Sequence, residues 1–342
     1  MGKVSTFLLS PSSFLFPFFL FLFLASCSQS SHRFHLEGRF KNLNQGEFYI
    51  YNPDQGTKDT IAVNDGRFTY DRTLQDTLTL ILLFPNYSEL PIFAHPGAKV
   101  KMEGDATHLR ETQVTGTPEN ESMTAFRMKT ADMMPPEVQK EAELFIKENA
   151  TSPVSNYLLR RYILLSTTPD YQKAEKLCAA LRKAQPQQQQ LARLYTLLED
   201  LKNHIPDGPL PPFSAVDTKG DSISNKTLKS DANMIVVWST WNSASQSILH
   251  LLSTFDEEDL KRMTIVSICL DASPNEGKSV LERDSIQWPN ICDSMLWKSP
   301  LITQLGIATL PANILVDKQG NIVGRNIGND ELEKKIKALL DK

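Results

Sequence analysis

The sequence has few cysteines, and no two of them lie close together in the chain. The four are Cys27, Cys178, Cys269 and Cys292. A Cys-x-x-Cys pair, in which one thiolate attacks and the second sulfur resolves the mixed disulfide, is therefore absent. An excess of basic residues is also missing, since the formal net charge is −4. The chain lacks the basic stripe that binds nucleic acid, and no nucleic-acid partner is predicted.

Side chains with the spacing of metal ligands are missing as well. His32 and His35 lie close together without a further ligand nearby, and His95 and His108 are scattered. A zinc site uses three or four protein ligands. We therefore expect these histidines to be surface or turn residues, and we predict neither a metal nor a cofactor.

The longest apolar run lies at the N-terminus. Lys3 precedes an apolar stretch from Phe7 to Leu24, with six phenylalanines between positions 14 and 23. One positive charge, an apolar stretch and small residues at its end are typical of a secretory signal. The run ends in Leu-Ala-Ser followed by Cys27. This motif resembles the bacterial lipobox, in which the peptidase cuts before a cysteine that carries lipid.

We therefore predict a lipoprotein signal peptide over residues 1–26, a lipid on Cys27 and a short linker over residues 27–32. The alternative is an apolar anchor that is not cleaved. Both interpretations place the rest of the chain in the cell envelope of a bacterium, outside the cytoplasm and held to a membrane.

Residues 33–115 have the pattern of short β-strands. Phe34 and Leu36 share one parity, and Asn64-Asp-Gly66 separates two apolar stretches as in a tight hairpin turn. Short strands at regular spacing predict a small antiparallel β-sandwich.

Residues 116–206 change to a helical pattern. Pro135, Pro153 and Pro186 each open a segment, because proline suits the first turn of a helix. A further segment begins at Tyr171 and carries Cys178 among Ala and Leu. These amphipathic segments could bind a partner helix, but packing on one another and on the flanking domains is favoured. The proline-rich residues 205–212 mark a domain boundary.

Residues 207–342 alternate apolar strands with helices. The predicted elements are apolar strands at 234–238 and 264–270, a helix at 244–255, a hairpin of 312–317 and 321–323, and a last helix at 330–340. This order resembles that of a thioredoxin-like α/β domain.

Four motifs make the resemblance specific. They are Pro-Pro-Phe-Ser at 211–214, the turn from Trp238 to Trp241, Leu310-Pro311, and Leu-Val-Asp-x-x-Gly at 315–320. Together they resemble the TlpA/ResA type of membrane-tethered thiol–disulfide oxidoreductase, a thioredoxin-like (AhpC/TSA-like) group. The upstream regions resemble, more loosely, the β-rich domain of unknown function and the helical insert found in such envelope lipoproteins. The resemblance implies a cis peptide bond before Pro311 and, beside it and Trp238, a groove for an extended substrate segment.

The redox pair of this family falls on residues that cannot perform its chemistry. After Trp241 the chain has Asn242-Ser-Ala-Ser245 in place of Cys-x-x-Cys. A serine hydroxyl stays protonated near neutral pH, so Ser243 and Ser245 are predicted to cap the following helix. We therefore predict no catalytic residue at this turn, and a redox-inactive module that binds an extended peptide or an envelope protein.

Other interpretations accompany this one. Ser247 and His250 could face each other on a helix, but no nucleophile elbow or oxyanion motif supports a hydrolase. Cys269 and Cys292 could form a structural disulfide if their Cα atoms approach within about 7 Å. A thiol–disulfide oxidoreductase that uses an unusual cysteine or a partner's thiol is the alternative function. A scaffold that acts through its N-terminal parts is the third.

Overall fold

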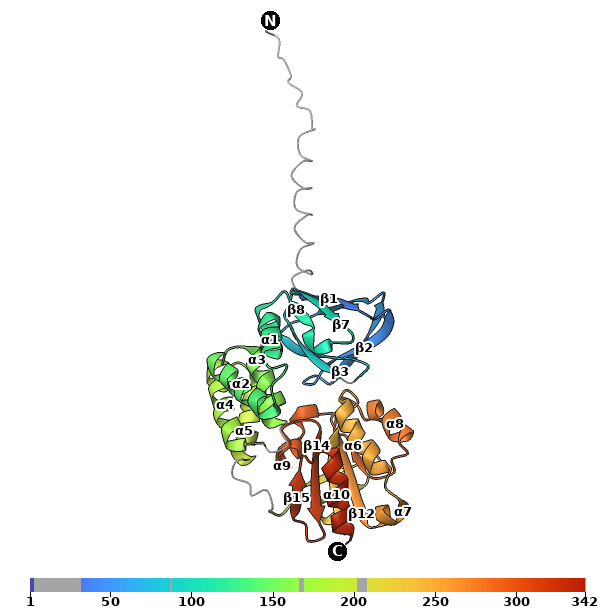
Figure 1. The fold of residues 1–342 in the computed structure, drawn as a ribbon. Coiled ribbons are helices and arrows are strands. Elements are labelled where there is room, and N and C mark those ends of the chain that lie inside the picture. The colour runs from blue at the N-terminus through green and yellow to red at the C-terminus, as the bar shows by residue number, and fades with distance from the viewer. Residues whose placement is uncertain (3–31, 87, 166–168, 202–207, 342) are drawn as a thin grey trace.

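The computed structural model describes residues 1–2, 32–86, 88–165, 169–201 and 208–341 of the 342-residue chain. Most of the predicted signal peptide and the predicted lipid site Cys27 lie outside the described residues. Within the described ranges, no helix is both long enough and apolar enough to cross a membrane. Figure 1 shows three parts: a β-rich part, a helical segment beside it, and an α/β part that contacts both.

The β-rich part is one eight-stranded sheet with the order β6-β5-β2-β3-β4-β1-β7-β8. Its strands are β1 (Arg33–Lys41), β2 (Gln45–Asn52), β3 (Thr57–Asn64), β4 (Arg67–Thr73), β5 (Leu78–Leu83), β6 (Glu89–Ala94), β7 (Lys99–Asp105) and β8 (Gln113–Thr115). The predicted hairpin turn is confirmed, because Asp65 and Gly66 both have positive φ between β3 and β4.

The predicted antiparallel sandwich is not confirmed. The eight strands belong to a single sheet, and β1 pairs with β7 in parallel rather than antiparallel fashion. Apolar side chains from both edges, including Ile92 of β6 and Val114 of β8, belong to one core, so the sheet must curl around it. Phenylalanine rings pack at the centre of this core with centroids 4.9 to 6.1 Å apart. Alternating apolar residues predict strands correctly but do not specify whether the strands divide into two sheets.

The helical segment contains α1 (Pro118–Lys129), α2 (Pro135–Glu148), α3 (Pro153–Leu158), the π-helical turn η3 (Leu159–Leu164), α4 (Tyr171–Ala184) and α5 (Gln189–Leu201). The helices pack on one another around a shared core, as expected. Pro135 and Pro153 begin helices, whereas Pro186 lies in the turn before α5, so its predicted role at a helix start is wrong. Buried Asn120 joins α1 to β6, since its side chain pairs with both the N–H and the C=O of Phe93.

The α/β part has a five-stranded sheet with the order β13-β12-β11-β14-β15. Its strands are β11 (Ala232–Trp238), β12 (Met263–Cys269), β13 (Asn290–Ile291), β14 (Ala312–Asp317) and β15 (Ile322–Arg325). The helices are α6 (Ser243–Ser253), α7 (Glu257–Lys261), α8 (Pro274–Arg283), α9 (Pro300–Gln304) and α10 (Asn329–Leu340), and a short hairpin of β9 (Ser214–Val216) and β10 (Ser222–Ser224) precedes the sheet. Strand β11 is parallel to β12 and antiparallel to β14, the thioredoxin-like arrangement that the sequence predicts.

The two faces of this sheet are covered by different parts of the chain. Alternate residues of β11, such as Val236, pack against α6, α8 and α10. The other face, which includes Ile235 and Val237, packs against α9 and against Tyr51, Ile81 and Leu83 of the β-rich part. The β-rich part and the α/β part therefore share one apolar core. This core fixes the surface beside the turn between β11 and α6, here called the degenerate turn because Asn242 and Ser245 stand in its two cysteine positions.

Candidate functional site

The turn between β11 and α6 is held by Asn242. Its side-chain oxygen accepts a hydrogen bond from the Ser245 N–H at 2.7 Å, which makes Asn242 the N-cap of α6. The predicted caps Ser243 and Ser245 are therefore wrong: Ser243 is the first residue of the helix and Ser245 lies within it. The residue in the first cysteine position of the family motif thus serves as a structural cap.

Ser245, in the second cysteine position, is fully buried and ties the turn together. Its hydroxyl donates to the Asn242 carbonyl at 2.7 Å and accepts the Ser239 N–H at 3.2 Å. Both hydrogen-bonding capacities of the hydroxyl are used within the backbone of the turn. A side chain so engaged is not free to attack a substrate.

A buried carboxylate fixes the residue before Trp241. The N–H of Thr240 lies 3.1 Å from each carboxylate oxygen of Asp271, and the Thr240 hydroxyl donates to the same group at 3.1 Å. Burial raises the pKa of Asp271, although these hydrogen bonds and the one from Cys269 oppose that effect. Asp271 follows β12, so it connects the turn to the neighbouring strand.

The β-rich part covers the turn. The ring of Tyr51 lies 5.7 Å from the Trp241 ring, between centroids, and Trp241 is only 2% exposed. The Trp241 indole donates to the Leu270 carbonyl, and the Trp297 indole donates to the Pro53 carbonyl across 244 positions of sequence. The surface beside the turn is therefore enclosed by the protein's own N-terminal sheet.

The residues predicted for a groove divide into two groups. The Leu310–Pro311 peptide bond is cis, and both residues lie beside Trp241 and Asn242 in the wall of one cavity. Trp238 lies elsewhere: it is fully buried on the opposite face of the sheet, and its indole donates to Asn290 at 3.0 Å. Its predicted place in the groove is wrong, because the side-chain alternation of β11 turns it toward α6, α8 and α10.

This cavity has a volume of about 580 Å³ and is bounded by all three parts of the chain. The α/β part contributes Trp241 to Ala244, Ser247, Trp297 and Ala308 to Pro311; the sheet contributes Tyr51 and residues 77–79; the helical segment contributes Tyr157, Arg160 and Arg161. Ligand sites are commonly concave and lie where domains meet. The turn between β11 and α6 is therefore one wall of a partly open cavity where the three parts of the chain meet.

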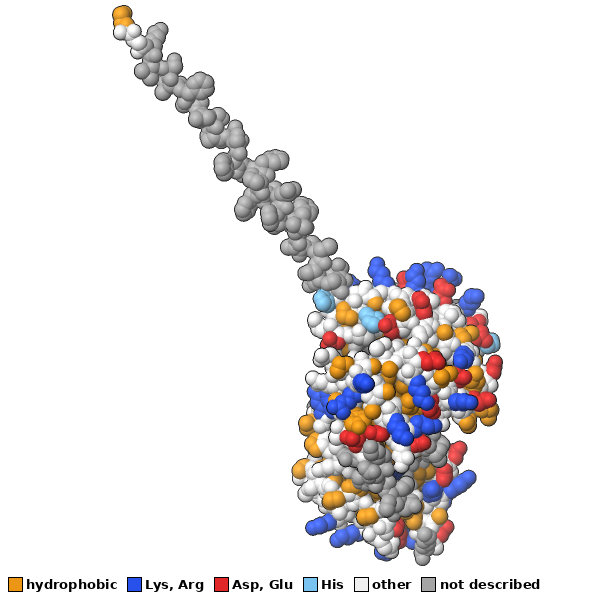
Figure 2. All heavy atoms as spheres, turned by 90° about the vertical axis from the view of Figure 1, so that its left-hand side faces the viewer, with side chains coloured by type: hydrophobic (Ala, Val, Ile, Leu, Met, Phe, Trp, Pro, Cys, Tyr) orange, Lys and Arg blue, Asp and Glu red, His pale blue; other side chains and the backbone are white. Residues whose placement is uncertain are grey.

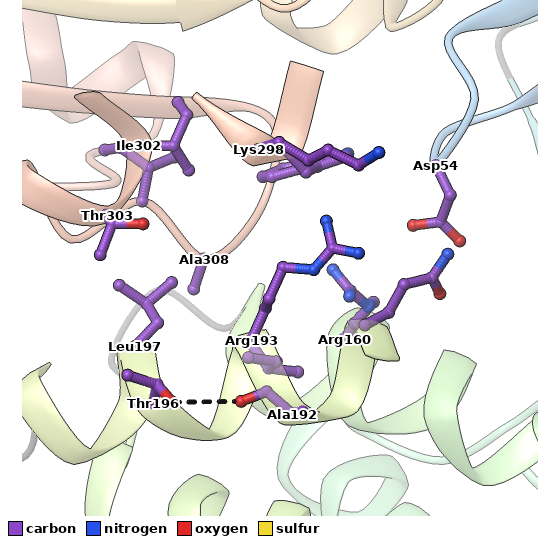
Figure 3. A pocket seen from close by; sticks show the side chains of 14 residues that line it. Asp54, Arg160, Ala192, Arg193, Thr196, Leu197, Lys298, Ile302, Thr303 and Ala308 are labelled. Carbon is purple, nitrogen blue, oxygen red and sulfur yellow. Dashed lines mark hydrogen bonds between the residues drawn. The ribbon is translucent and has the colours of Figure 1, made fainter. Parts of the chain in front are cut away.

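A second cavity, of about 410 Å³, adjoins the first and shares Asp54, Arg160 and Trp297 among its lining residues. It lies between α5 and the segment around α9. Figure 3 shows Arg193 of α5 and Lys298 extending into this space, with Arg160 nearby and Asp54 at one side.

Positive charge dominates the two cavities. Arg160, Arg161, Arg193 and Lys298 line them, against the carboxylates of Asp54 and Glu89. None of the four cations forms an ion pair with a described residue. On the face that Figure 2 presents, by contrast, basic side chains lie among acidic and apolar ones.

Tyr51 and Glu89 form a polar contact in the wall of the larger cavity. The Tyr51 hydroxyl donates to Glu89 at 2.6 Å, and burial, followed by the charge of Glu89, raises the pKa of Tyr51. Burial lowers the pKa of Arg161, but Tyr157 and Glu89 outweigh that effect and raise it overall. Arg161 therefore stays charged, with one neighbouring carboxylate already engaged by Tyr51.

The other candidate chemistries find little support in the geometry. The Ser247 hydroxyl donates to the Ser243 carbonyl, and the His250 ring lies 3.6 Å from Asp284, so Ser247 and His250 have separate partners. Across the described residues no cluster of His, Cys, Asp and Glu has metal-binding geometry. Cys269 and Cys292 are free thiols, so the structural disulfide is not formed here.

Comparison with known protein sequences finds similarity in separate parts of the chain. Residues 34–123 match the model of a domain of unknown function, DUF4369. The chain is 23% identical over 125 residues to the thiol-disulfide oxidoreductase ResA of Bacillus thuringiensis (strain Al Hakam). The aligned region covers 36% of this chain and 70% of that protein. A thioredoxin-like region similar to thiol-disulfide oxidoreductases therefore occupies part of the chain.

Similarity to solved structures is also found. One is the C-terminal domain of a putative thiol-disulfide oxidoreductase from Bacteroides thetaiotaomicron, with 27% identity and a TM-score of 0.36 over 40% of this chain and 97% of that one. Another is a putative thiol:disulfide interchange protein DsbE from Chlorobium tepidum, with 18% identity and a TM-score of 0.35 over 40% and 98% of the two chains.

Sequence reasoning identified the turn and Pro311 but missed the opposite walls of the cavity. Tyr51, Arg160 and Arg161 come from distant segments whose local patterns give only a strand and a helix. No signal in the sequence relates them to Trp241.

Proposed function

We propose that this chain binds an extended, acidic polypeptide segment in the paired cavities, and that its thioredoxin-like domain acts as a binding module rather than through thiols at the turn. The observation that carries the proposal is the cavity wall at Thr309 and Leu310. The backbone N–H and C=O groups of these two residues form no hydrogen bond with another described residue. Buried backbone groups need partners, and an extended peptide supplies them by strand-like hydrogen bonding.

The charge of the lining supports the acidic class of ligand. Four cations that form no ion pair with any residue the structure describes surround the two adjoining spaces, so a carboxylate-bearing segment would gain charge-assisted hydrogen bonds there. Tyr157 and Leu310 supply apolar surface for the alternate side chains of an extended segment.

The test is titration with an acetylated peptide that alternates Glu and Val, with Gln/Val and Lys/Val peptides as controls. We expect saturable binding of the Glu/Val peptide that weakens with salt, and at least about tenfold weaker binding of the Lys/Val peptide. Ala244 is exposed and lines the cavity, so Ala244→Trp should fill the space and weaken binding, whereas Ala244→Ser should not. Arg161→Gln should weaken binding and Lys226→Gln, on the exposed surface, should not. An affinity for the Glu/Val peptide that is unchanged by both Ala244→Trp and Arg161→Gln would refute the proposed site.

The competing proposal is a thiol–disulfide oxidoreductase of the cell envelope that uses a cysteine outside the turn or a thiol from a partner. Peptide titration and disulfide-reductase turnover, measured together on the purified chain, separate the two, because the binding module requires saturable peptide binding and the enzyme does not. Turnover abolished by Cys292→Ser and accompanied by no peptide binding would favour the enzyme.

We further propose that the chain is exported and anchored by lipid on Cys27, on the strength of the lipobox-like motif. Mass spectrometry of the chain expressed in a bacterial host should find a lipid-modified N-terminal Cys27, and Cys27→Ala should release the protein from membranes. An unmodified Cys27 within an intact N-terminus would overturn this proposal.

A further inference from the structure

Two of the cysteines are neighbours on adjacent strands. Strands β12 and β13 are parallel, and their register pairs Ser267 with Asn290 and Ile268 with Ile291. The next residues along each chain are Cys269 and Cys292. Neighbouring strands lie about 4.8 Å apart, and a disulfide needs Cα atoms about 4.4 to 6.8 Å apart, so this register suits a disulfide.

The two side chains also lie on the same side of the sheet. Cys269 belongs to the core on the α6, α8 and α10 side of the sheet, and Cys292 packs against that core. The Cys269 sulfur lies 3.1 Å from the carboxylate of Asp271, and the Cys292 sulfur lies 3.8 Å from the Asp271 carbonyl. Both sulfurs therefore converge on one residue.

The two thiols differ in access. Cys269 is 2% exposed, whereas Cys292 is partly exposed. The remaining described cysteine, Cys178, is buried in the helical segment with its sulfur 3.6 Å from the Leu191 carbonyl. A reagent from solvent reaches Cys292 first, and Cys269 is placed to act second.

We propose that Cys269 and Cys292 form a reversible dithiol–disulfide pair that exchanges with an external disulfide, with Cys292 attacking and Cys269 resolving. This inference does not depend on peptide binding in the cavities. Its co-reactant is any accessible disulfide, either of a protein or of a small thiol.

The exchange balances in two steps. The Cys292 thiolate attacks one sulfur of R–S–S–R, forming a Cys292–S–S–R bond and releasing one R–S⁻. Cys269 then passes its proton to the Asp271 carboxylate and attacks the Cys292 sulfur, forming the Cys269–Cys292 bond and releasing the second R–S⁻. The pair loses two electrons, and the external disulfide gains them.

The electrostatics agree with this division of roles. A hydrogen bond from the Cys269 thiol to the Cys292 thiolate, made in place of the one to Asp271, lowers the pKa of Cys292, helped by the Ser294 N–H and opposed by burial and by Asp271 and Asp293. The same interaction, together with burial, raises the pKa of Cys269. The more exposed sulfur is therefore the better nucleophile.

The experiment equilibrates the full chain with mixtures of reduced and oxidised glutathione, blocks free thiols with N-ethylmaleimide and maps the peptides by mass spectrometry. We expect a Cys269–Cys292 cross-linked peptide whose fraction follows the glutathione ratio, with Cys178 alkylated after unfolding at every ratio. The Cys178→Ser variant should give the same titration. Wild-type protein alone decides the pairing, so a variant that fails to fold does not affect the outcome.

Roles are assigned with single variants. In Cys269→Ser, Cys292 should accumulate a stable mixed disulfide with glutathione, whereas in Cys292→Ser the folded protein should react at least about tenfold more slowly. Cys269 and Cys292 that stay fully alkylatable at every ratio would overturn the pair. A stable mixed disulfide on Cys292 of the wild type would overturn the resolving role of Cys269.

Discussion

Replacing Asn242 by alanine should loosen the first turn of α6. The substitution removes the oxygen that accepts the Ser245 N–H at 2.7 Å, and Asn242 is only 8% exposed, so water cannot readily replace it. Losing a helix cap costs about 1 kcal/mol, and leaving a buried N–H unpaired costs about 1 to 3 kcal/mol. Both ranges describe the loss of this one hydrogen bond, and we expect a loss of about 2 kcal/mol.

That loss corresponds to a roughly 30-fold larger opening constant for the turn. Amide hydrogen exchange at Ser245 in the native protein measures it locally, without assuming that the three parts unfold together. Asn242→Asp retains an acceptor and should stay close to the wild type. The matched control is Ser243→Ala, where the change should stay within about 0.5 kcal/mol. Equal loss of protection in Ser243→Ala, or none in Asn242→Ala, would refute the assignment of the cap.

Three further outcomes are expected. Tyr51→Ala removes the ring packed against Trp241 and should lower the free energy of unfolding by about 3 to 5 kcal/mol and shift the tryptophan fluorescence to the red; an unchanged spectrum would contradict the contact. Burial raises the pKa of Asp271, so the folded state binds more protons than the unfolded one, and its stability should fall as pH rises from about 3.9 through the raised value. The difference in stability between wild type and Asp271→Asn, followed by urea unfolding, should show this fall, and a flat difference would argue against a raised value. The rate of Cys292 alkylation should rise with pH, with a midpoint at lower pH than for an ordinary thiol. Cys269→Ala should move this midpoint to higher pH, because a donor to the thiolate is lost. A midpoint that does not move would contradict the hydrogen bond.

Many of the strands, helices and turns could be predicted because they follow from local sequence patterns. The apolar run that became β11 and the Asp65-Gly66 turn depend on neighbours in the chain. Trp238 shows the limit of that reasoning. Trp238 is the last residue of β11 and directly precedes the turn. Its side chain nevertheless points to the opposite face of the sheet, because side chains alternate between the two faces along a strand.

The cap shows a second limit. Asn242, Ser243 and Ser245 are all good capping residues, and the backbone geometry at the turn selects one of them. The cavity and the thiol pair depend on long-range register. Trp297 meets Pro53 across 244 positions, and Cys292 reaches Cys269 through a strand of only two residues, which leaves almost no trace in a sequence pattern.

In the proposed complex, the wall of the cavity at Leu310 pairs with an extended acidic segment. The decisive measurement is the amide hydrogen exchange of Thr309 and Leu310, with and without a saturating Glu/Val peptide. Pairing with the peptide should slow the exchange of at least one of these amides, and Ala244→Trp should abolish the slowing. If the peptide binds but exchange at both positions stays unchanged, the peptide lies elsewhere on the protein and the proposed site is wrong.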